Sequence, residues 1–556
     1  MNREYKEKLS RKIEKNYSDL EMRILEDIVR RIRKTKEITS TADWQINRLR
    51  ILGNSSEDIE KMLKETLKAS YPQMFELYDK VIDWEYVRNK DIYEQINAEF
   101  IPYEENGELQ QATNAMIRQT DAEFQNITQS LGFYLDYGTG KPVITPLAEV
   151  YQKYLDAACI EIVSGAFDYN SVLRRVVTQL TNSGLRQIDY ASGRANRVDV
   201  AARRAVMTGI TQLTGHISDM NAEKLGTEYF EIAWHAGARP THQVWQGKVW
   251  SRQQLVTVCG LGTVTGLEGA NCYHERYPFI PGISERNWTD EWLEKKNREE
   301  NTPKEFRGKK YTVYEAKQRQ RQMETAMRAQ REKVQLLKAG GADPDDVMIA
   351  RAKYQGQLNE YARFSKKMGL KEERERIYYD MRGRIATNTK EQNAKYTPDM
   401  IRNATRDSKQ YDRYKSIVGR SAGSLADFRQ MKYNDPEKFG VLKKKVDTYS
   451  EIDKKKWSGE FKQKSKAVYD RFEKKGIYMS VHALSRMPRL NKSGYPEIEE
   501  KDIMDMLRGQ PNYSEGEKKL VFFDPERQLV VIKNKETDDI ISIVRRKNPK
   551  EEWNNV

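Results

Sequence analysis

Apolar residues in the first part of the chain recur at the spacing of an α-helix. Four of them lie four positions apart in one stripe: Leu20, Ile24, Ile28 and Ile32. Such a stripe between charged positions is typical of a helix that packs one face on a core. A loop with a strand-like centre, "YGTGKPVITPL" (137–147), interrupts the pattern, which then resumes. We therefore predict a helical region at 1–225.

The pattern changes near residue 227. The segment "TEYFEIAWHAGARP" (227–240) is rich in aromatic residues and ends in glycine and proline, which predicts a short strand followed by a turn. Six glycines between 237 and 269 supply tight turns, and three tryptophans supply a small core. We predict a compact α/β or β-rich module at 226–285.

Long polar helices are predicted to follow this module. Residues 286–390 are rich in glutamine, arginine and lysine, and "GGADPDD" (340–346) marks the turn of a helical hairpin. Residues 391–475 contain "KKK" at 443–445 and again at 454–456, which indicates a basic, lysine-rich linker.

The last 80 residues change character again. "YMSVHALSRMPRL" (478–490) predicts a strand that leads into a helix, and a second helix follows at 497–510. Three strands separated by turns are predicted within 518–547. Residues 476–556 thus form a small α+β domain with a three- or four-stranded antiparallel sheet. The chain as a whole is predicted to be mainly α with two small α+β modules, in an elongated multi-domain arrangement.

Composition adds limits to this picture. Hydrophobic residues make up 38% of the 556 residues and charged residues 32%, which favours extended, solvated helices over one compact enzyme. Three cysteines argue against a disulfide framework and for synthesis in a reducing compartment. The charged first 20 residues lack the apolar segment of a secretory signal, and no run of 18 apolar residues occurs. We expect no membrane partner.

Positive charge is concentrated in one segment. Residues 301–475 hold 44 lysines and arginines against 25 acidic residues, a net charge of +19, while the rest of the chain carries −5. This distribution is expected of a chain that lies near a polyanion such as nucleic acid. The alternative is a set of solvated helices with surplus lysine.

Rare chemistry-bearing residues crowd into 234–274. Three of the five histidines and two of the three cysteines lie there. A zinc site would use four of them: His235, His242, Cys272 and His274. Their spacing argues against zinc, because the first two histidines are seven residues apart and the Cys-x-His pair is tighter than a usual zinc knuckle.

A nucleophilic cysteine–histidine pair is a second alternative for this segment, but no orienting Asp or Asn is evident beside it other than Asn271. We therefore expect no metal and no cofactor here. The histidines and Arg239 are expected to hydrogen-bond the loops of a small rigid module.

A family resemblance rests on this same segment. The strings "HAGARPTHQVWQGKVW" (235–250) and "GANCYH" (269–274) resemble the signature of the phage minor capsid protein 2 family, which is akin to the Mu F-type head morphogenesis proteins. The resemblance extends over about residues 1–390. The motif positions are His235, Arg239, His242, Gly247, Cys272 and His274.

The resemblance implies a virion protein, present in few copies at the portal vertex or in the capsid interior. Its implied partners are the portal and major capsid proteins and the packaged DNA, which it would contact without sequence preference. The implied role is in head assembly, DNA packaging or ejection, after synthesis in the host bacterial cytoplasm. The family motif carries no assigned reaction. A cytoplasmic nucleic-acid-binding scaffold is the remaining alternative.

The C-terminal domain contains a different candidate site. On a helix, His482 and Arg486 lie one turn apart, a pair that suits metal-independent RNA cleavage by general acid–base catalysis and phosphate stabilisation. Three further residues are candidates for the same site: Arg508, Ser542 and Arg545.

The order of elements is similar to that of the barnase–EndoU–colicin–RelE group of ribonuclease toxins. This resemblance implies a ribonuclease effector delivered with the virion, with host RNA as substrate and a cognate immunity protein as partner. The alternative is a non-catalytic domain that binds a virion partner or DNA.

Overall fold

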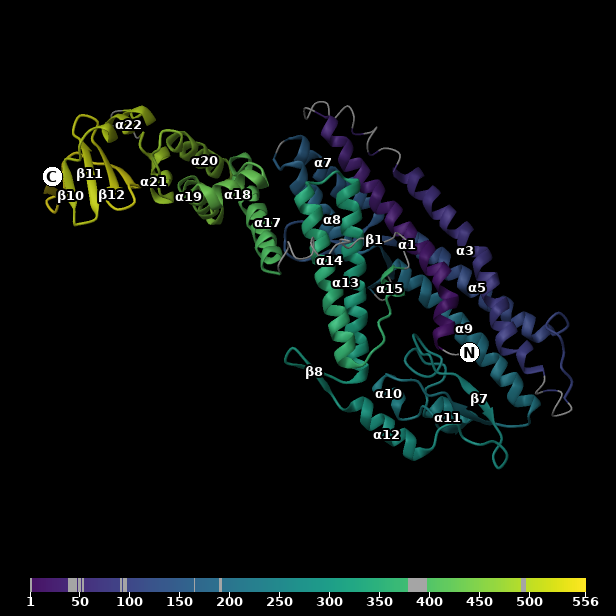
Figure 1. Ribbon diagram of the computed structural model, residues 1–556. Helices are drawn as coiled ribbons and strands as arrows, with labels where there is room; N and C mark the ends of the chain where they lie inside the picture. The colour runs from purple at the N-terminus through teal and green to yellow at the C-terminus, as the bar shows by residue number, and fades with distance from the viewer. Residues whose placement is uncertain are drawn as a thin grey trace. The chain divides into compact units, whose positions relative to one another are not determined.

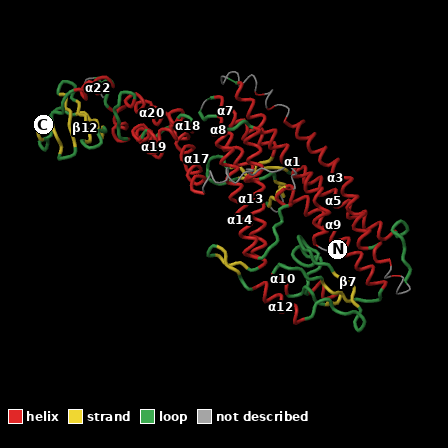
Figure 2. Tube along the Cα trace, viewed as in Figure 1, coloured by secondary structure: helices red, strands yellow, loops and turns green. Residues whose placement is uncertain are grey.

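Helices make up most of the computed structural model, and strands gather in small antiparallel sheets (Figure 2). The predicted fold class, mainly α with small α+β modules, is confirmed. Two compact units are present, residues 1–405 and 406–556. The structure describes residues 3–38, 48, 52, 55–90, 93, 98–164, 166–189, 193–378, 398–491 and 497–556. Every helix in these ranges is too short or too polar to cross a bilayer.

Four long helices pack side by side in the first unit (Figure 1). They are α1 (Arg3–Lys34), α3 (Ser55–Glu85), α5 (Gly107–Gln129) and α9 (Val198–Lys224). All four residues of the predicted stripe on α1 are fully buried, which confirms that prediction. α9 contacts each of the other three helices, and small residues permit the close approach. A Cβ atom on Gly209 would lie 1.9 Å from the hydroxyl oxygen of Tyr78.

The predicted helical hairpin is present. Its arms are α13 (Val313–Ala339) and α14 (Pro344–Met368), and they pack against each other. Thr312 begins α13 with a capping box, and Gly341 turns the chain with a positive φ of 64°. α13 also packs on α8 (Tyr169–Ser183), so the hairpin joins the core of the long helices.

A four-stranded antiparallel sheet lies among these helices, in the order β2-β1-β3-β4. Its strands are β1 (Leu131–Leu135), β2 (Val143–Pro146), β3 (Arg186–Asp189) and β4 (Arg194–Arg197). The sequence predicted only the strand-like segment that became β2. β3 and β4 are short and polar, so their pairing with β1 leaves little periodic signal.

Shorter elements complete the first unit: α6 (Leu147–Glu149), a π-helical segment (Val150–Leu155), α7 (Asp156–Val163), α12 (Asp290–Asn301), β8 (Lys304–Phe306), β9 (Lys309–Tyr311) and α15 (Glu375–Tyr378).

The glycine- and tryptophan-rich module contains a three-stranded antiparallel sheet in the order β6-β5-β7. Its elements are β5 (Tyr229–Ile232), α10 (Pro240–Gln243), β6 (Val249–Ser251), α11 (Arg252–Thr257) and β7 (Arg276–Phe279). The predicted strand is therefore present. Trp245 lies in the module's core and Trp250 packs against it, whereas Trp234 contacts Trp292 of α12.

The second unit contains helices where a linker was expected. They are α17 (Pro398–Val418), whose first eight residues precede the boundary at 406, α18 (Leu425–Asn434), α19 (Pro436–Lys454) and α20 (Gly459–Glu473). Their aromatic residues, including Tyr411, Phe428 and Phe472, share one core with the C-terminal sheet. Lysine dominates the composition of this segment, and few apolar residues are enough to bury one face of each helix.

A five-stranded antiparallel sheet ends the chain, in the order β13-β12-β11-β10-β14. Its strands are β10 (Tyr513–Glu515), β11 (Lys519–Asp524), β12 (Leu529–Asn534), β13 (Ile540–Arg545) and the two-residue β14 (Asn554–Asn555). α21 (Val481–Arg486) packs on one face of it, α22 (Glu500–Arg508) contacts β11, and Trp553 lies on the other face. The predicted α+β domain is present, with one or two strands more than expected.

Candidate functional site

The cysteine and histidine cluster forms where two distant parts of the module meet. His242 lies on the short helix α10, and Pro240 is the first residue of that helix. Cys272 and His274 lie just before β7, and pairing of β7 with β5 brings them beside α10. The backbone N–H of Ala233 donates to the carbonyl of Glu275 at 2.8 Å and extends this pairing toward the cluster.

Three of the four sequence-predicted zinc candidates face one another. Nδ1 of His242 lies 3.4 Å from Nδ1 of His274, which in turn lies 3.4 Å from Sγ of Cys272. The ligand atoms of all three lie within 4.8 Å of one another. The three residues are buried, with exposed fractions of 2, 4 and 1% in chain order.

Polar groups of the module orient both imidazoles. Nε2 of His242 donates to the carbonyl oxygen of Thr265 at 2.8 Å. Nε2 of His274 donates to Oε1 of Gln246 at 2.9 Å. These hydrogen bonds fix the orientation of each ring, and the Nδ1 atoms of the two rings face each other.

Burial controls the charge of this cluster. Desolvation lowers the pKa of His242, and it lowers the pKa of His274 well below the ordinary value, with the neighbouring His235 and His242 adding to that effect. Desolvation also raises the pKa of the Cys272 thiol. The rings are therefore neutral at neutral pH, which is the form of histidine that ligates metals.

The other motif residues shape the surroundings. The half-buried His235 ring lies on that of His274, with centroids 4.1 Å apart. Arg239 donates to the carbonyl oxygens of Thr265 and Ala270. Gly247 has a positive φ of 72°, and a Cβ there would lie 2.5 Å from a methyl carbon of Leu293.

Cys259, the other cysteine of this segment, shares the module's apolar core with Cys272 but is not among the three residues whose ligand atoms face one another. Burial raises its pKa to about 12. It is therefore a packing residue.

A cavity of about 450 Å³ opens beside the cluster. His235, Arg239, His242 and Cys272 line it from the module. Further cations line it from the helices: Arg203, Lys317, Arg321, Arg328 and Arg376. Several of these are ion-paired, for example Arg321 with Glu324 at 2.9 Å.

Sequence reasoning missed the cations of the cavity wall. Lys317, Arg321 and Arg328 lie on α13 at intervals of four and seven residues, which places them on one face of the helix. That periodicity was a usable signal. It gave no indication that α13 lies beside the module.

The comparison with known protein families decides what the motif belongs to. The chain matches the family described as phage minor capsid protein 2 over residues 1–363. The chain belongs to the phage minor capsid protein 2 family. No curated protein and no solved structure matches it.

This match confirms the resemblance and covers all six motif positions of the minor capsid protein. It supports a structural role related to the phage head and an association with the virion. Residues 364–556, which include the second unit, lie outside the matched range.

The five candidate residues of the C-terminal sheet domain do not gather at one point. His482 and Arg486 are both exposed on α21. Arg545 lies on the α21 face of the sheet, because its cross-strand partner Leu529 belongs to the core that α21 joins. Its side chain donates to the backbone carbonyls of Leu490 and Arg527. The exposed Arg508 side chain pairs with Asp505 at 3.0 Å.

Ser542 lies on the face of the sheet opposite α21. It pairs across the ladder with Ile532, and cross-strand partners share a face. Ile532 belongs to the cluster around Trp553, whereas α21 packs with Ile543 on the other side.

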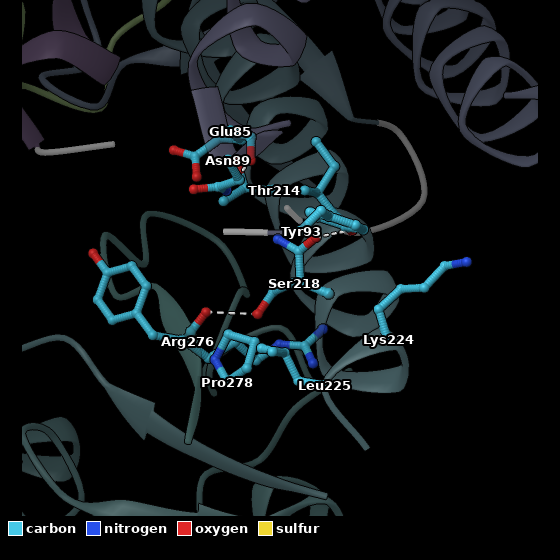
Figure 3. Close-up of a pocket in the computed structure, with 12 residues that line it drawn as sticks. Glu85, Asn89, Tyr93, Thr214, Ser218, Lys224, Leu225, Arg276 and Pro278 are labelled. Atoms are coloured by element: carbon cyan, nitrogen blue, oxygen red, sulfur yellow. Dashed lines mark hydrogen bonds between the residues drawn. The ribbon is translucent and has the colours of Figure 1, made fainter. Parts of the chain in front are cut away.

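The minor capsid protein has a second cavity, of about 320 Å³, between α3, α9 and β7 (Figure 3). Ser218 donates to the carbonyl oxygen of Arg276 at 2.7 Å within it, and Tyr93 donates to Asn221. The Lys224 side chain extends away from the other side chains in Figure 3. None of the twelve described residues that line this cavity is a histidine or a cysteine, so the cluster above is the stronger candidate site.

Proposed function

We propose that this minor capsid protein acts at the portal vertex of the phage head, where it assists head assembly, DNA packaging or ejection. The family match over residues 1–363 carries the proposal. The proposed partners are the portal protein, the major capsid protein and the packaged DNA. Association with the virion supports these partners, because a phage particle contains all three.

Particle composition tests this role. Purified particles should contain the full-length protein at low copy number relative to the major capsid protein. Chemical cross-linking followed by mass spectrometry should join it to the portal protein. Absence from purified particles, or cross-links to the major capsid protein alone, would contradict the portal assignment.

Contact with DNA is supported by the charge of the lysine-rich segment. Lys454, Lys455 and Lys456 are all exposed at the end of α19. A sequence-independent phosphate contact releases counterions, and the logarithm of the binding constant then changes by about 0.9 per contact for each tenfold change in salt. Three contacts would contribute a slope of about 2.7.

A triple substitution of these lysines by glutamine tests the DNA contact. Fragment 406–556 should bind duplexes of unrelated sequence equally, and the variant should show a salt slope smaller by about 2.7. The matched control is Lys518→Gln, a single exposed lysine before β11. Equal salt slopes in the wild type and the triple variant would refute a phosphate contact at this end of α19.

A second candidate function, a ribonuclease in the C-terminal unit, is supported by His482 and Arg486. Both side chains are exposed one turn apart on α21, within a unit that has its own core. In such a reaction the imidazole would take the proton of a ribose 2′-hydroxyl, and the 2′-oxygen would bond to the adjacent phosphorus as the bond from phosphorus to the 5′-oxygen breaks. The leaving 5′-oxygen would take a proton from solvent. The guanidinium would stabilise the charge that develops on the phosphate. Host RNA would be the substrate, and an immunity protein would protect the producing cell.

Expression of fragment 406–556 in bacteria tests this candidate. The wild-type fragment should arrest growth and fragment cellular RNA, and His482→Ala and Arg486→Ala should abolish both effects. Lys518→Ala is the matched control, because it removes an exposed cation that is not one of the five candidate residues and should keep the activity. If the wild-type fragment leaves growth and RNA intact, the unit is a non-catalytic domain that binds a virion partner or DNA.

A further inference from the structure

The hydrogen bond of His242 sets which of its ring nitrogens holds a lone pair. The carbonyl oxygen of Thr265 can only accept, so the proton of the neutral ring lies on Nε2. Nδ1 of His242 therefore points a lone pair into the cluster.

Gln246 sets the second ring in the same way. Its Oε1 accepts the backbone N–H of His235 at 3.2 Å, and that N–H can only donate. The amide oxygen therefore also faces His274, whose Nε2 must carry the proton. Nδ1 of His274 is left with a lone pair, 3.4 Å from Nδ1 of His242.

Two lone pairs at this distance repel each other, and one thiol proton on Cys272 can satisfy only one of them. A cation between the three atoms removes that repulsion. With zinc–nitrogen bonds of about 2.0 Å and zinc–sulfur bonds of about 2.3 Å, tetrahedral ligand atoms lie about 3.3–3.6 Å apart. The nitrogen–nitrogen distance and the sulfur–nitrogen distance from His274 are both 3.4 Å.

The geometry points to a zinc site formed by Nδ1 of His242, Sγ of Cys272 and Nδ1 of His274. Nitrogen and sulfur ligands favour zinc over magnesium and calcium, which require oxygen. Zinc binding releases the thiol proton to solvent, so the sulfur ligates as a thiolate. Thr265 and Gln246 then orient the imidazoles from outside, as such partners do in metal sites.

The fourth coordination position faces the 450 Å³ cavity, because His242 and Cys272 both line it. A zinc ion with three protein ligands binds a water molecule at its fourth coordination position. His235 also lines this cavity, but its ring lies on that of His274 and its Nδ1 faces its own neighbour's carbonyl, that of Ala236.

Elemental analysis of the full-length protein tests the site. After expression with added zinc chloride and removal of loose metal, the protein should retain about one zinc ion per chain. Cys272→Ser and His242→Ala should lose at least nine-tenths of it. Cys259→Ser is the matched control, since it removes a buried cysteine of the same module and should keep the zinc.

A second test measures the absorption spectrum of wild-type protein after a chelator has removed its metal and cobalt chloride has been added. Because the wild type is measured, the result does not depend on whether a variant folds. An intense near-ultraviolet absorption band from a thiolate bound to Co²⁺ is expected, and Cys259→Ser should show it too. Absence of both the zinc and the cobalt band in the wild type would overturn the site. Retention of zinc by Cys272→Ser would overturn the ligand set, and loss of zinc from His235→Ala would overturn the open fourth position.

Discussion

At the scale of single residues, Gln246 uses one side-chain oxygen to accept two hydrogen bonds from different parts of the module. Its oxygen accepts from the backbone of His235 and from the ring of His274. The side chain thus links the end of β5 to the segment before β7. Gln246 lies within the string at 235–250, but the sequence did not single it out, because glutamine is neither a usual zinc ligand nor a nucleophile.

We predict that Gln246→Leu weakens zinc binding by about 10–100-fold while leaving all three ligands in place, because the imidazole of His274 loses its outer hydrogen-bond partner. Competition with a chromogenic chelator measures the affinity. Gln243→Leu is the control, because the oxygen of that buried side chain accepts a hydrogen bond from Asn301 of α12. Equal affinities in the Gln246 variant and the wild type would show that the amide does not support the site.

Glu515 on β10 provides a pH-dependent prediction. Its carboxylate contacts Lys519 and Lys550, and these hydrogen bonds lower its pKa to about 2. The folded unit therefore binds fewer protons than the unfolded chain between about pH 4.5 and 2. The stabilisation is complete above that range and is lost as the pH falls through it.

Glu515→Gln should accordingly lower the free energy of unfolding of fragment 406–556 by about 1 kcal/mol at pH 7. The difference from the wild type should shrink toward zero near pH 2. Urea denaturation at several pH values measures this. A difference that stays constant with pH would mean that the ion pairs contribute nothing.

At the scale of elements, periodicity predicted the parts whose apolar residues repeat. The stripe on α1, the hairpin of α13 and α14, and the strand β5 were all predicted from local patterns. The helices of 398–473 were missed because lysine masks their sparse apolar positions. β3 and β4 were missed because their stability comes from pairing with a distant strand and from packing under α9.

The candidate site was only partly predictable for a related reason. The spacing argument against zinc assumed that ligands come from one or two tight local loops. In the structure one ligand comes from α10, and the other two precede β7 in the sheet. Long-range strand pairing thus brings together His242 and His274, whose separation of 32 positions in sequence indicates no proximity.

A buried ion network joins three elements of the first unit. The guanidinium of Arg197, at the end of β4, contacts Glu21 of α1 at 2.8 Å and Glu332 of α13 at 2.9 Å. All three groups are buried, and burial raises the pKa of Glu332 to about 7. Arg197 is the cation that contacts both carboxylates.

We predict that Arg197→Met lowers the free energy of unfolding by about 3–5 kcal/mol, because two buried carboxylates lose their partner. Thermal unfolding of the full-length protein measures the loss. Arg194→Met, an exposed position on the same strand, should change stability by less than about 0.5 kcal/mol. Equal losses in the two variants would assign the effect to the strand and not to the network.

At the scale of the whole molecule, the two compact units have separate cores. The family match falls within the first unit, and the C-terminal sheet domain lies in the second. We predict two calorimetric transitions, of which Arg197→Met shifts only one and Glu515→Gln only the other. A single transition shifted by both substitutions would show that the units unfold together.

The distance along the chain between the cluster's ligands has a consequence for how the module keeps its shape. An ion held by His242 and Cys272 would close the intervening 29 residues into a ring. By the chain-entropy estimate for a cross-link of this size, ring closure disfavours the unfolded chain by about 3.6 kcal/mol. A disulfide with the same reach would be reduced in a cytoplasm, whereas a metal clasp would persist there. The folded module would thus be stabilised before a particle is assembled, without any oxidation step.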